Sequence, residues 1–213
     1  MDKLRITEIF LSIQGESSFV GWPTVFVRLT GCPLRCVYCD TAYAFSGGEI
    51  RTISGILKQV RAYQTRHVCV TGGEPLAQPG CLMLLRSLAE AGYAVSLETS
   101  GALDIAEVDR RVVKVMDLKT PSSGEEGRNI YANIEHLLSR DQVKFVIMNR
   151  DDYRWSVEIL HKYRLSERCE VLFSPANGEQ DPKELAEMIL ADRLSVRFQL
   201  QLHKILWGDT PGK

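Results

Sequence analysis

Three cysteines, Cys32, Cys36 and Cys39, lie close together in a C-x3-C-x2-C pattern. One short loop can therefore present three thiolates to an iron–sulfur cluster. A cubane cluster has four irons, so this pattern leaves one iron open to a ligand that is not protein, which indicates chemistry rather than electron storage alone. The alternative is structural zinc, which takes four ligands in a closed tetrahedron, and no nearby fourth Cys or His is evident.

A second candidate motif is the turn Gly72-Gly73-Glu74, which follows the apolar segment 68–71. In one interpretation it is a plain strand-to-helix turn, in which glycines supply positive φ angles. In the other, bare backbone and a carboxylate receive an amino group. The cysteine triplet in the same chain favours the second interpretation.

Short apolar segments that are typical of strands alternate with helical patterns along the chain. The predicted core strands are Thr24–Leu29, Val68–Thr71, Ala94–Glu98, Lys114–Leu118, Val143–Ile147 and Glu170–Ser174, with Leu4–Ile9 and Arg197–Leu202 as further candidates. Apolar residues at helical spacing predict helices over 53–63, 82–89, 159–163 and 185–189, with Gly92 ending the second.

This alternation predicts an α/β fold in which right-handed crossovers build a parallel sheet. About six core strands would form an open, partial β/α barrel, and residues 1–213 would form one domain. Polar residues follow the strand ends at 31–32, 72–74, 99–101, 119–120 and 176–177. Because ligands bind at the carboxyl ends of parallel strands, we expect one site that collects these segments.

Composition narrows the class of protein. The 213 residues are 45% hydrophobic and 25% charged, with a net charge of −1, which is typical of a soluble globular protein without the basic excess that a nucleic-acid partner requires. We expect no signal peptide, no membrane span and a cytoplasmic location. In that reducing compartment, Cys69, Cys81 and Cys169 are expected to be free thiols rather than parts of disulfides.

The cysteine triplet, with Tyr38 before its last member, resembles the radical S-adenosylmethionine (SAM) superfamily, and Gly72-Gly73-Glu74 resembles that superfamily's second hallmark. The resemblance implies a [4Fe–4S] cluster on Cys32, Cys36 and Cys39 whose open iron is chelated by the amino and carboxylate groups of SAM. An electron from the cluster would then release a 5′-deoxyadenosyl radical. The glycine turn would receive the methionine amino group, and Tyr38 would lie against the adenine.

Further segments resemble the 7-carboxy-7-deazaguanine synthases over nearly the whole chain: 9–17, 21–29, 31–32, 39–41 and 201–204. For that family, the resemblance implies a ring contraction of 6-carboxy-5,6,7,8-tetrahydropterin to 7-carboxy-7-deazaguanine with loss of ammonia. The radical takes a hydrogen atom from C6 of the pterin, and SAM is regenerated. The product feeds deazapurine nucleosides such as queuosine.

The resemblance also implies a set of substrate contacts. These are Ile13, Gln14, Gly15, Glu16, Arg28, Thr71 and His203. Gln and Glu side chains can bond the amide and amino edge of a pterin, and a guanidinium can bind the substrate carboxylate bidentately. The alternatives are a polar turn for 13–16, an internal salt bridge for Arg28 and a structural role for His203.

Contacts with the cofactors are implied in the same way. For SAM these are Tyr38, Cys39, Asp40, Gly73, Asp117, Leu118, Lys119, Ser174, Pro175, Ala176 and Asn177. Thr41 would bind Mg²⁺, although its position alone favours a helix cap or a turn. The resemblance further implies a homodimer and a protein reductant such as flavodoxin or ferredoxin. No catalytic side chain is assigned beyond the cluster and the cofactor radical.

Two other functions are open from the motifs alone. One is an activating enzyme that installs a glycyl radical in a partner protein, which would share the cysteines and the glycine turn but has no reason for Gln14, Arg28 and Thr41. The other is a non-catalytic protein that binds zinc or an iron–sulfur cluster. Cleavage of SAM by the reduced protein would separate the radical enzymes from this last class.

Overall fold

One mostly parallel sheet organises the computed structural model, which describes residues 2–208, 210 and 212. Within these residues the strands follow the order β3-β1-β2-β4-β5-β6-β7-β8-β9. Their bounds are β1 (Lys3–Ile13), β2 (Pro23–Leu29), β3 (Glu49–Thr52), β4 (His67–Gly72), β5 (Ala94–Thr99), β6 (Val113–Asp117), β7 (Gln142–Ile147), β8 (Glu170–Pro175) and β9 (Arg197–Phe198).

The parallel part of the sheet runs from β2 to β9, and β1 pairs antiparallel with both β2 and β3. The predicted α/β class and the six predicted core strands are confirmed. The expected first strand is longer than predicted, because β1 continues to Ile13. The expected last strand has only two residues, because the chain turns into a short helix at Leu202. Strand β3, which is exposed and polar, was not predicted.

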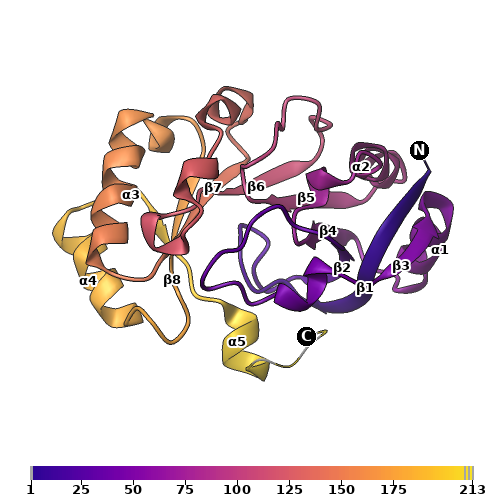
Figure 1. Ribbon diagram of the computed structural model, residues 1–213, viewed down its shortest axis with the longest axis horizontal. Helices are drawn as coiled ribbons and strands as arrows, with labels where there is room; N and C mark the ends of the chain where they lie inside the picture. The colour runs from indigo at the N-terminus through magenta and orange to yellow at the C-terminus, as the bar shows by residue number, and fades with distance from the viewer. Residues whose placement is uncertain (1, 209, 211, 213) are drawn as a thin grey trace.

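Helices α1 and α2 lie on one side of the molecule and α3 and α4 on the other, with α5 apart from both pairs (Figure 1). Their bounds are α1 (Ile53–Ala62), α2 (Cys81–Glu90), α3 (Arg150–Lys162), α4 (Pro182–Ala191) and α5 (Leu202–Trp207). None of the helices in the described ranges combines the length and apolar character that a membrane crossing requires.

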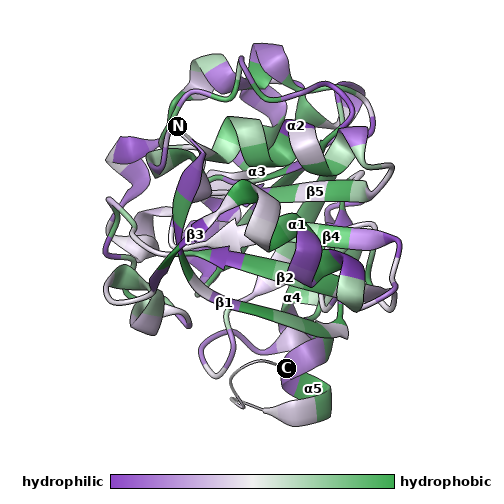
Figure 2. Cartoon of the chain, turned by 90° about the vertical axis from the view of Figure 1, so that its right-hand side faces the viewer, coloured by the Kyte–Doolittle hydropathy of each residue, from purple (hydrophilic) through white to green (hydrophobic). Residues whose placement is uncertain are grey.

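Each long helix buries one face that carries apolar residues, as the helical spacing predicts. Figure 2 shows hydrophobic residues, in green, along α2 and along β4 and β5. In α2 the buried face is Leu84, Leu85 and Leu88, which join one core cluster with strand residues such as Val27. Gly92, at a φ of +85°, follows the end of α2 and donates from its N–H to the carbonyl of Ala89. The glycine therefore ends this helix as predicted.

No α-helix connects β5 to β6 or β6 to β7 in the described part of the chain. The first connection is irregular, and the second contains short 3-10 turns over 121–123, 126–128 and 131–136. Asn133 stabilises both, because its Nδ2 donates to the carbonyls of Gly101 and Leu103. Asp152 at the start of α3 accepts from the backbone N–H groups of Ser122 and Met148. Side-chain hydrogen bonds thus replace the packing of a crossover helix here.

A cavity at the carboxyl ends of the strands

The predicted site segments meet at a cavity of about 520 Å³. It lies where the parallel strands end, so the expectation of one collecting site is confirmed in geometry. The lining includes the predicted residues Ile13, Gln14, Glu16, Arg28, Cys32, Cys36, Tyr38, Cys39, Asp40, Thr41, Thr71, Gly73, Asp117, Lys119, Ala176, Asn177 and His203. Which of these touch a ligand stays a prediction.

Four predicted residues lie behind this lining. The carbonyl of Gly15 accepts from the N–H of Leu202 at 3.0 Å, and a Cβ at Gly15 would collide with Nδ1 of His203. Leu118 is in the hydrophobic core. Ser174 and Pro175 are buried at the end of β8. Any contact of these four with a ligand would therefore involve the backbone or act through a neighbour.

The cysteine loop is fastened to two other segments. Its first residue, Gly31, donates to the carbonyl of Ala44 at 2.8 Å, and the N–H of Val37 donates to the carbonyl of Ser123 at 3.0 Å. The guanidinium of Arg35 lies 4.3 Å from the centre of the Phe45 ring. These contacts hold the loop that carries all three cysteines over the cavity.

The thiols of this loop are half-buried, whereas the three other cysteines are buried, and all six are free of disulfides. Burial raises the pKa of Cys32, and it raises the pKa of Cys36 to about 11. The Cys32 and Cys36 thiols are therefore protonated at neutral pH, and a metal must displace these protons to bind. Among the described residues, no three His, Cys, Asp or Glu side chains converge on one ion.

The glycine turn lies against the start of the cysteine loop. Gly72 has a φ of +154°, and a Cβ there would collide with the carbonyl oxygen of Leu29. A Cβ at Gly73 would similarly collide with the carbonyl oxygen of Gly31 and approach Cβ of Cys32 to 2.7 Å. The N–H of Glu74 donates to the carbonyl of Gly31 at 2.8 Å. Bare backbone is thus required at Gly72 for close contact with the end of β2, and at Gly73 for close contact with the cysteine loop.

Glu74 itself is fully buried. Its carboxylate accepts from the Thr99 hydroxyl at 2.9 Å, from the Ser100 N–H at 2.7 Å and from the Leu76 N–H at 3.0 Å. The expectation that this carboxylate receives an amino group is not supported, since its oxygens already hold the turn to the end of β5. An incoming amino group would meet the glycine backbone instead.

We expect Glu74→Gln to lower the free energy of unfolding by about 2–3 kcal/mol, because a charged acceptor of several buried hydrogen bonds is replaced by an amide that cannot accept them all. Urea unfolding of the purified variant measures this change. Glu187→Gln, on the exposed face of α4, is the control and should stay within about 0.5 kcal/mol of the parent protein. Equal stability of the two variants would contradict the bracing role of Glu74.

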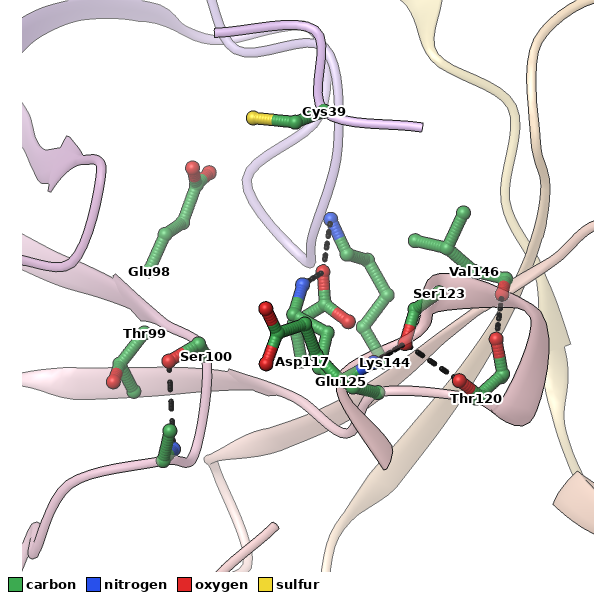
Figure 3. A network of polar contacts seen from close by, with 12 residues as sticks. Cys39, Glu98, Thr99, Ser100, Asp117, Thr120, Ser123, Glu125, Lys144 and Val146 are labelled. Atoms are coloured by element: carbon green, nitrogen blue, oxygen red, sulfur yellow. Dashed lines mark hydrogen bonds and ion pairs between the residues drawn. The ribbon is translucent and has the colours of Figure 1, made fainter. Parts of the chain in front are cut away.

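A row of charges crosses the floor of the cavity. Nζ of Lys144 lies 3.6 Å from Oδ2 of Asp117 (Figure 3) and 2.7 Å from Oε2 of Glu16. Oδ2 of Asp117 also pairs with Nζ of Lys119 at 3.0 Å. Burial alone would raise the pKa of Glu16, but the Lys144 ammonium holds it below its usual value. Burial would lower the pKa of Lys144, but the carboxylates of Glu16 and Asp117 hold it well above its usual value. Both partners are therefore ionised at neutral pH.

Arg28 also lines the cavity and is held in place by Glu8. Its Nε donates to Oε1 of Glu8 at 2.7 Å, and the Tyr43 hydroxyl donates to the same oxygen at 2.8 Å. The guanidinium carbon lies 5.9 Å and 5.8 Å from the centres of the Phe10 and Tyr43 rings. The internal salt bridge considered above therefore exists. Because it uses Nε, it is compatible with an anion on the two terminal nitrogens.

Several lining residues and their partners were outside the predicted set. Lys144 lies inside a strand that was predicted for its apolar residues, and Glu8 lies in a strand predicted only to flank the core. Glu98 ends up between Thr71, whose hydroxyl donates to it at 2.9 Å, and Gln14, whose Nε2 donates at 3.5 Å. A charged residue within an apolar strand was the available signal for Lys144.

Two buried polar atoms in the lining have no hydrogen-bond partner among the described residues: the Tyr38 hydroxyl and Oδ1 of Asp117. Unpaired buried polar atoms are rare and require a partner. A ligand with hydroxyl groups or ring nitrogens, such as the adenosine part of SAM, would supply one. The residues present thus fit the cofactor that the cysteine triplet implies.

Comparison with known proteins gives the same picture. The sequence profile of the radical SAM superfamily matches residues 26–189. A protein of Chlorobaculum tepidum named 7-carboxy-7-deazaguanine synthase is 46% identical over 208 residues, covering 96% of this chain and 94% of its own. One of Koribacter versatilis with the same name is 40% identical, covering 96% and 97%. The crystal structure of QueE from Escherichia coli superimposes with a TM-score of 0.79 over 94% of this chain and 95% of that one, at 23% identity, which shows the shared fold.

Proposed function

The chain belongs to the 7-carboxy-7-deazaguanine synthases within the radical SAM superfamily, and we propose that it converts 6-carboxy-5,6,7,8-tetrahydropterin to 7-carboxy-7-deazaguanine with loss of ammonia. The observation that carries this proposal is the meeting of two residue sets at one cavity. The first is the cysteine triplet, and the second is Gln14, Glu16 and Arg28. A glycyl-radical activating enzyme would need the first set but not the second.

The cofactors supply the radical chemistry, and the chain supplies their ligands. When bound, a [4Fe–4S] cluster and SAM provide the radical that removes a hydrogen atom from C6 of the pterin. Cys32, Cys36 and Cys39 would hold the cluster. The glycine backbone at 72–73, the unpaired Tyr38 hydroxyl and Oδ1 of Asp117 would hold SAM beside it.

The polar lining around Arg28 would orient the substrate. The terminal nitrogens of Arg28 would bind its carboxylate, since Glu8 already fixes the guanidinium through Nε. Gln14, which is nearly buried, can donate to and accept from the amide edge of the ring. Ionised Glu16 can accept only, so it would bind ring N–H groups. The specificity would thus come from simultaneous recognition of the ring edge and the carboxylate of the pterin.

The direct test is anaerobic incubation of the reconstituted protein with a reductant, SAM, Mg²⁺ and the carboxylated tetrahydropterin. We expect the deazaguanine acid to form while SAM is not consumed in proportion to product. Cleavage of SAM without this product would contradict the substrate assignment and leave the superfamily assignment intact. Absence of cleavage as well would favour a non-catalytic cluster protein.

A Mg²⁺ ion at Thr41 is the next part of the proposal. Thr41 precedes the 3-10 turn over 42–45, but its hydroxyl does not cap that turn. The hydroxyl lines the cavity and lies 3.8 Å from Sγ of Cys39. A hard hydroxyl oxygen suits Mg²⁺, which commonly takes few protein ligands and completes its shell with substrate and water oxygens.

We expect thorough chelation to lower the rate about tenfold and added Mg²⁺ to restore it, because the ion would help to fix the substrate. Thr41→Val should need a higher Mg²⁺ concentration for half-maximal rate, and Thr41→Ser should not. Steady-state assays over a series of Mg²⁺ concentrations measure this. A rate in chelator equal to the rate in Mg²⁺ would contradict the assignment.

We also infer a reductant such as flavodoxin or ferredoxin, a homodimer and a cytoplasmic location, on the strength of family membership. For the reductant, the cysteine loop offers a surface: Val37, between the second and third cysteines, is 73% exposed. To test the reductant, candidate donors are added to the protein, and reduction of the cluster is measured as loss of its visible absorbance. Sedimentation of the purified protein tests whether it is a homodimer.

A further inference from the structure

Lys144 connects two segments of the cavity that are far apart in the sequence. Its Nζ is 2.7 Å from Oε2 of Glu16, which follows β1, and 3.6 Å from Oδ2 of Asp117, which ends β6. Figure 3 shows its side chain rising from β7 toward the Asp117 carboxylate. One ammonium group is therefore shared by a carboxylate of each segment.

The backbone of Lys144 holds the second segment as well. Lys144 is the register partner of Asp117 across β6 and β7, and its carbonyl accepts from the N–H of Leu118 at 3.0 Å. The segment 117–119 is thus attached to Lys144 through both main chain and side chain. The segment 14–16 depends on Lys144 through the Glu16 carboxylate. A displacement of Lys144 would affect both.

The charges involved have little access to water. The exposed fractions of the side chains are 13% for Lys144, 10% for Glu16 and 17% for Asp117. Coulombic interactions are strong in such surroundings, and removing one partner leaves a poorly solvated charge unpaired. The carboxylate of Glu98 adds to the field that keeps Lys144 charged. The Lys144 ammonium is therefore the main charge that holds the Glu16 carboxylate, which also has a hydrogen bond with the Gln201 side chain.

We propose that Lys144 is a positioning residue that couples the two ligand sites, so that SAM bound at 117–119 orders the substrate segment 14–16 through the Glu16–Lys144–Asp117 bridge. The identity of the two ligands rests on the proposed function. The unpaired Oδ1 of Asp117 is the point at which a cofactor can enter the bridge. A ligand bonded there fixes the Asp117 carboxylate, which fixes the ammonium and then Glu16. When the first ligand has ordered these segments, the second ligand binds without that entropy cost. The coupling is therefore positive, and each ligand tightens binding of the other.

Hydrogen exchange on the reconstituted protein, with its cluster left oxidised so that no turnover occurs, tests the coupling. SAM should slow amide exchange over residues 14–18 by roughly fivefold or more in the parent protein, the lower end of ordinary allosteric coupling. In Lys144→Met this slowing should disappear, although exchange near 117–119 still responds to saturating SAM. Lys144→Arg keeps a cation that can reach both carboxylates and should restore part of the effect.

Lys114 provides a matched control. Its Nζ pairs with Oδ2 of Asp141 at 2.8 Å, with side chains 3% and 0% exposed, and it lies at the start of β6 rather than at the cavity. Lys114→Met therefore breaks a more deeply buried Lys–Asp pair whose lysine lies in the neighbouring strand. We expect it to lower stability but to transmit the effect of SAM to residues 14–18 as the parent protein does.

Two results would overturn the proposal: no slowing at 14–18 in the parent protein, or the same slowing in Lys144→Met. Lys144→Gln, which removes the charge but keeps a polar side chain, gives the same comparison if Lys144→Met does not fold. Binding of the carboxylated tetrahydropterin gives a second readout, since saturating SAM should tighten it in the parent protein and not in the variants that lack the charge. If the pterin fails to bind or react while SAM still acts through Lys144, only the proposed function is wrong.

Discussion

Cys36→Ala is expected to abolish formation of the deazaguanine acid and to leave less than a full complement of iron and sulfide on the protein. Cys36 lies in the middle of the triplet and lines the cavity. With two thiolates left, the loop can no longer hold three irons of a cubane and keep the fourth open for SAM. Anaerobic reconstitution followed by iron and sulfide analysis, visible absorbance and the product assay measures both effects.

The matched control is Cys169→Ala. Cys169 is also a free thiol, but it is buried at the start of β8, away from the cavity lining. Its removal should leave the iron content and the product rate close to those of the parent protein. Loss of iron in Cys169→Ala equal to that in Cys36→Ala would show that cluster loss reflects general instability. Full activity of Cys36→Ala would contradict the cluster assignment.

Arg28→Ala is expected to raise KM for the carboxylated pterin roughly a hundredfold, with a much smaller change in kcat. Loss of a charge-assisted contact with a carboxylate in a water-poor site is worth about 3 kcal/mol, and tenfold corresponds to about 1.4 kcal/mol. The carboxylate is attached to C6 but stays ionised while C6 loses its hydrogen, so the contact stabilises ground state and transition state alike and acts mainly on KM. Steady-state kinetics at saturating SAM measures the two constants.

A tetrahydropterin without the 6-carboxylate shows whether Arg28→Ala weakens binding through the lost carboxylate contact or through a change in the structure of the site. It should inhibit the parent protein and Arg28→Ala with similar affinity, because it offers Arg28 nothing to bind. Arg51→Ala, on the exposed strand β3, is the control for loss of an arginine and should not change KM. If Arg28→Ala lowers thermal stability but leaves KM unchanged, the Glu8 salt bridge is the whole function of Arg28.

The cavity was predictable from the sequence to the extent that it depends on strand ends. The apolar run before Gly31 and the one before Gly72 are local patterns, and parallel pairing of β2 with β4 then places the two turns side by side. The cysteine and glycine motifs could therefore be assigned to one site from the order of the strands alone. The same reasoning placed Lys119 at its edge, whereas Thr41 was assigned only through the family resemblance.

The part that could not be predicted depends on pairs of side chains far apart in the chain. Lys144 alone is one charge inside a strand, and nothing local points to Glu16 as its partner. The sequence suggested Glu74 as a ligand contact. Its carboxylate instead accepts hydrogen bonds from Thr99 and Ser100, and these depend on the pairing of β5 with β4, which no local pattern reveals. The extension of β1 to Ile13 and the start of α5 at Leu202 are fixed by tertiary packing, which local propensity does not include.

The bond from Leu202 to Gly15, with His203 packed where a Cβ of Gly15 would be, joins segments separated by nearly the whole chain. During synthesis the earlier segment leaves the ribosome long before the later one exists, and contacts of such long sequence separation form late. The strands and the metal loop can be in place while this side of the cavity is still missing. A chain that ends before Leu202 should therefore still form its strands and cysteine loop, but its cavity would lack the side that His203 and Lys204 provide.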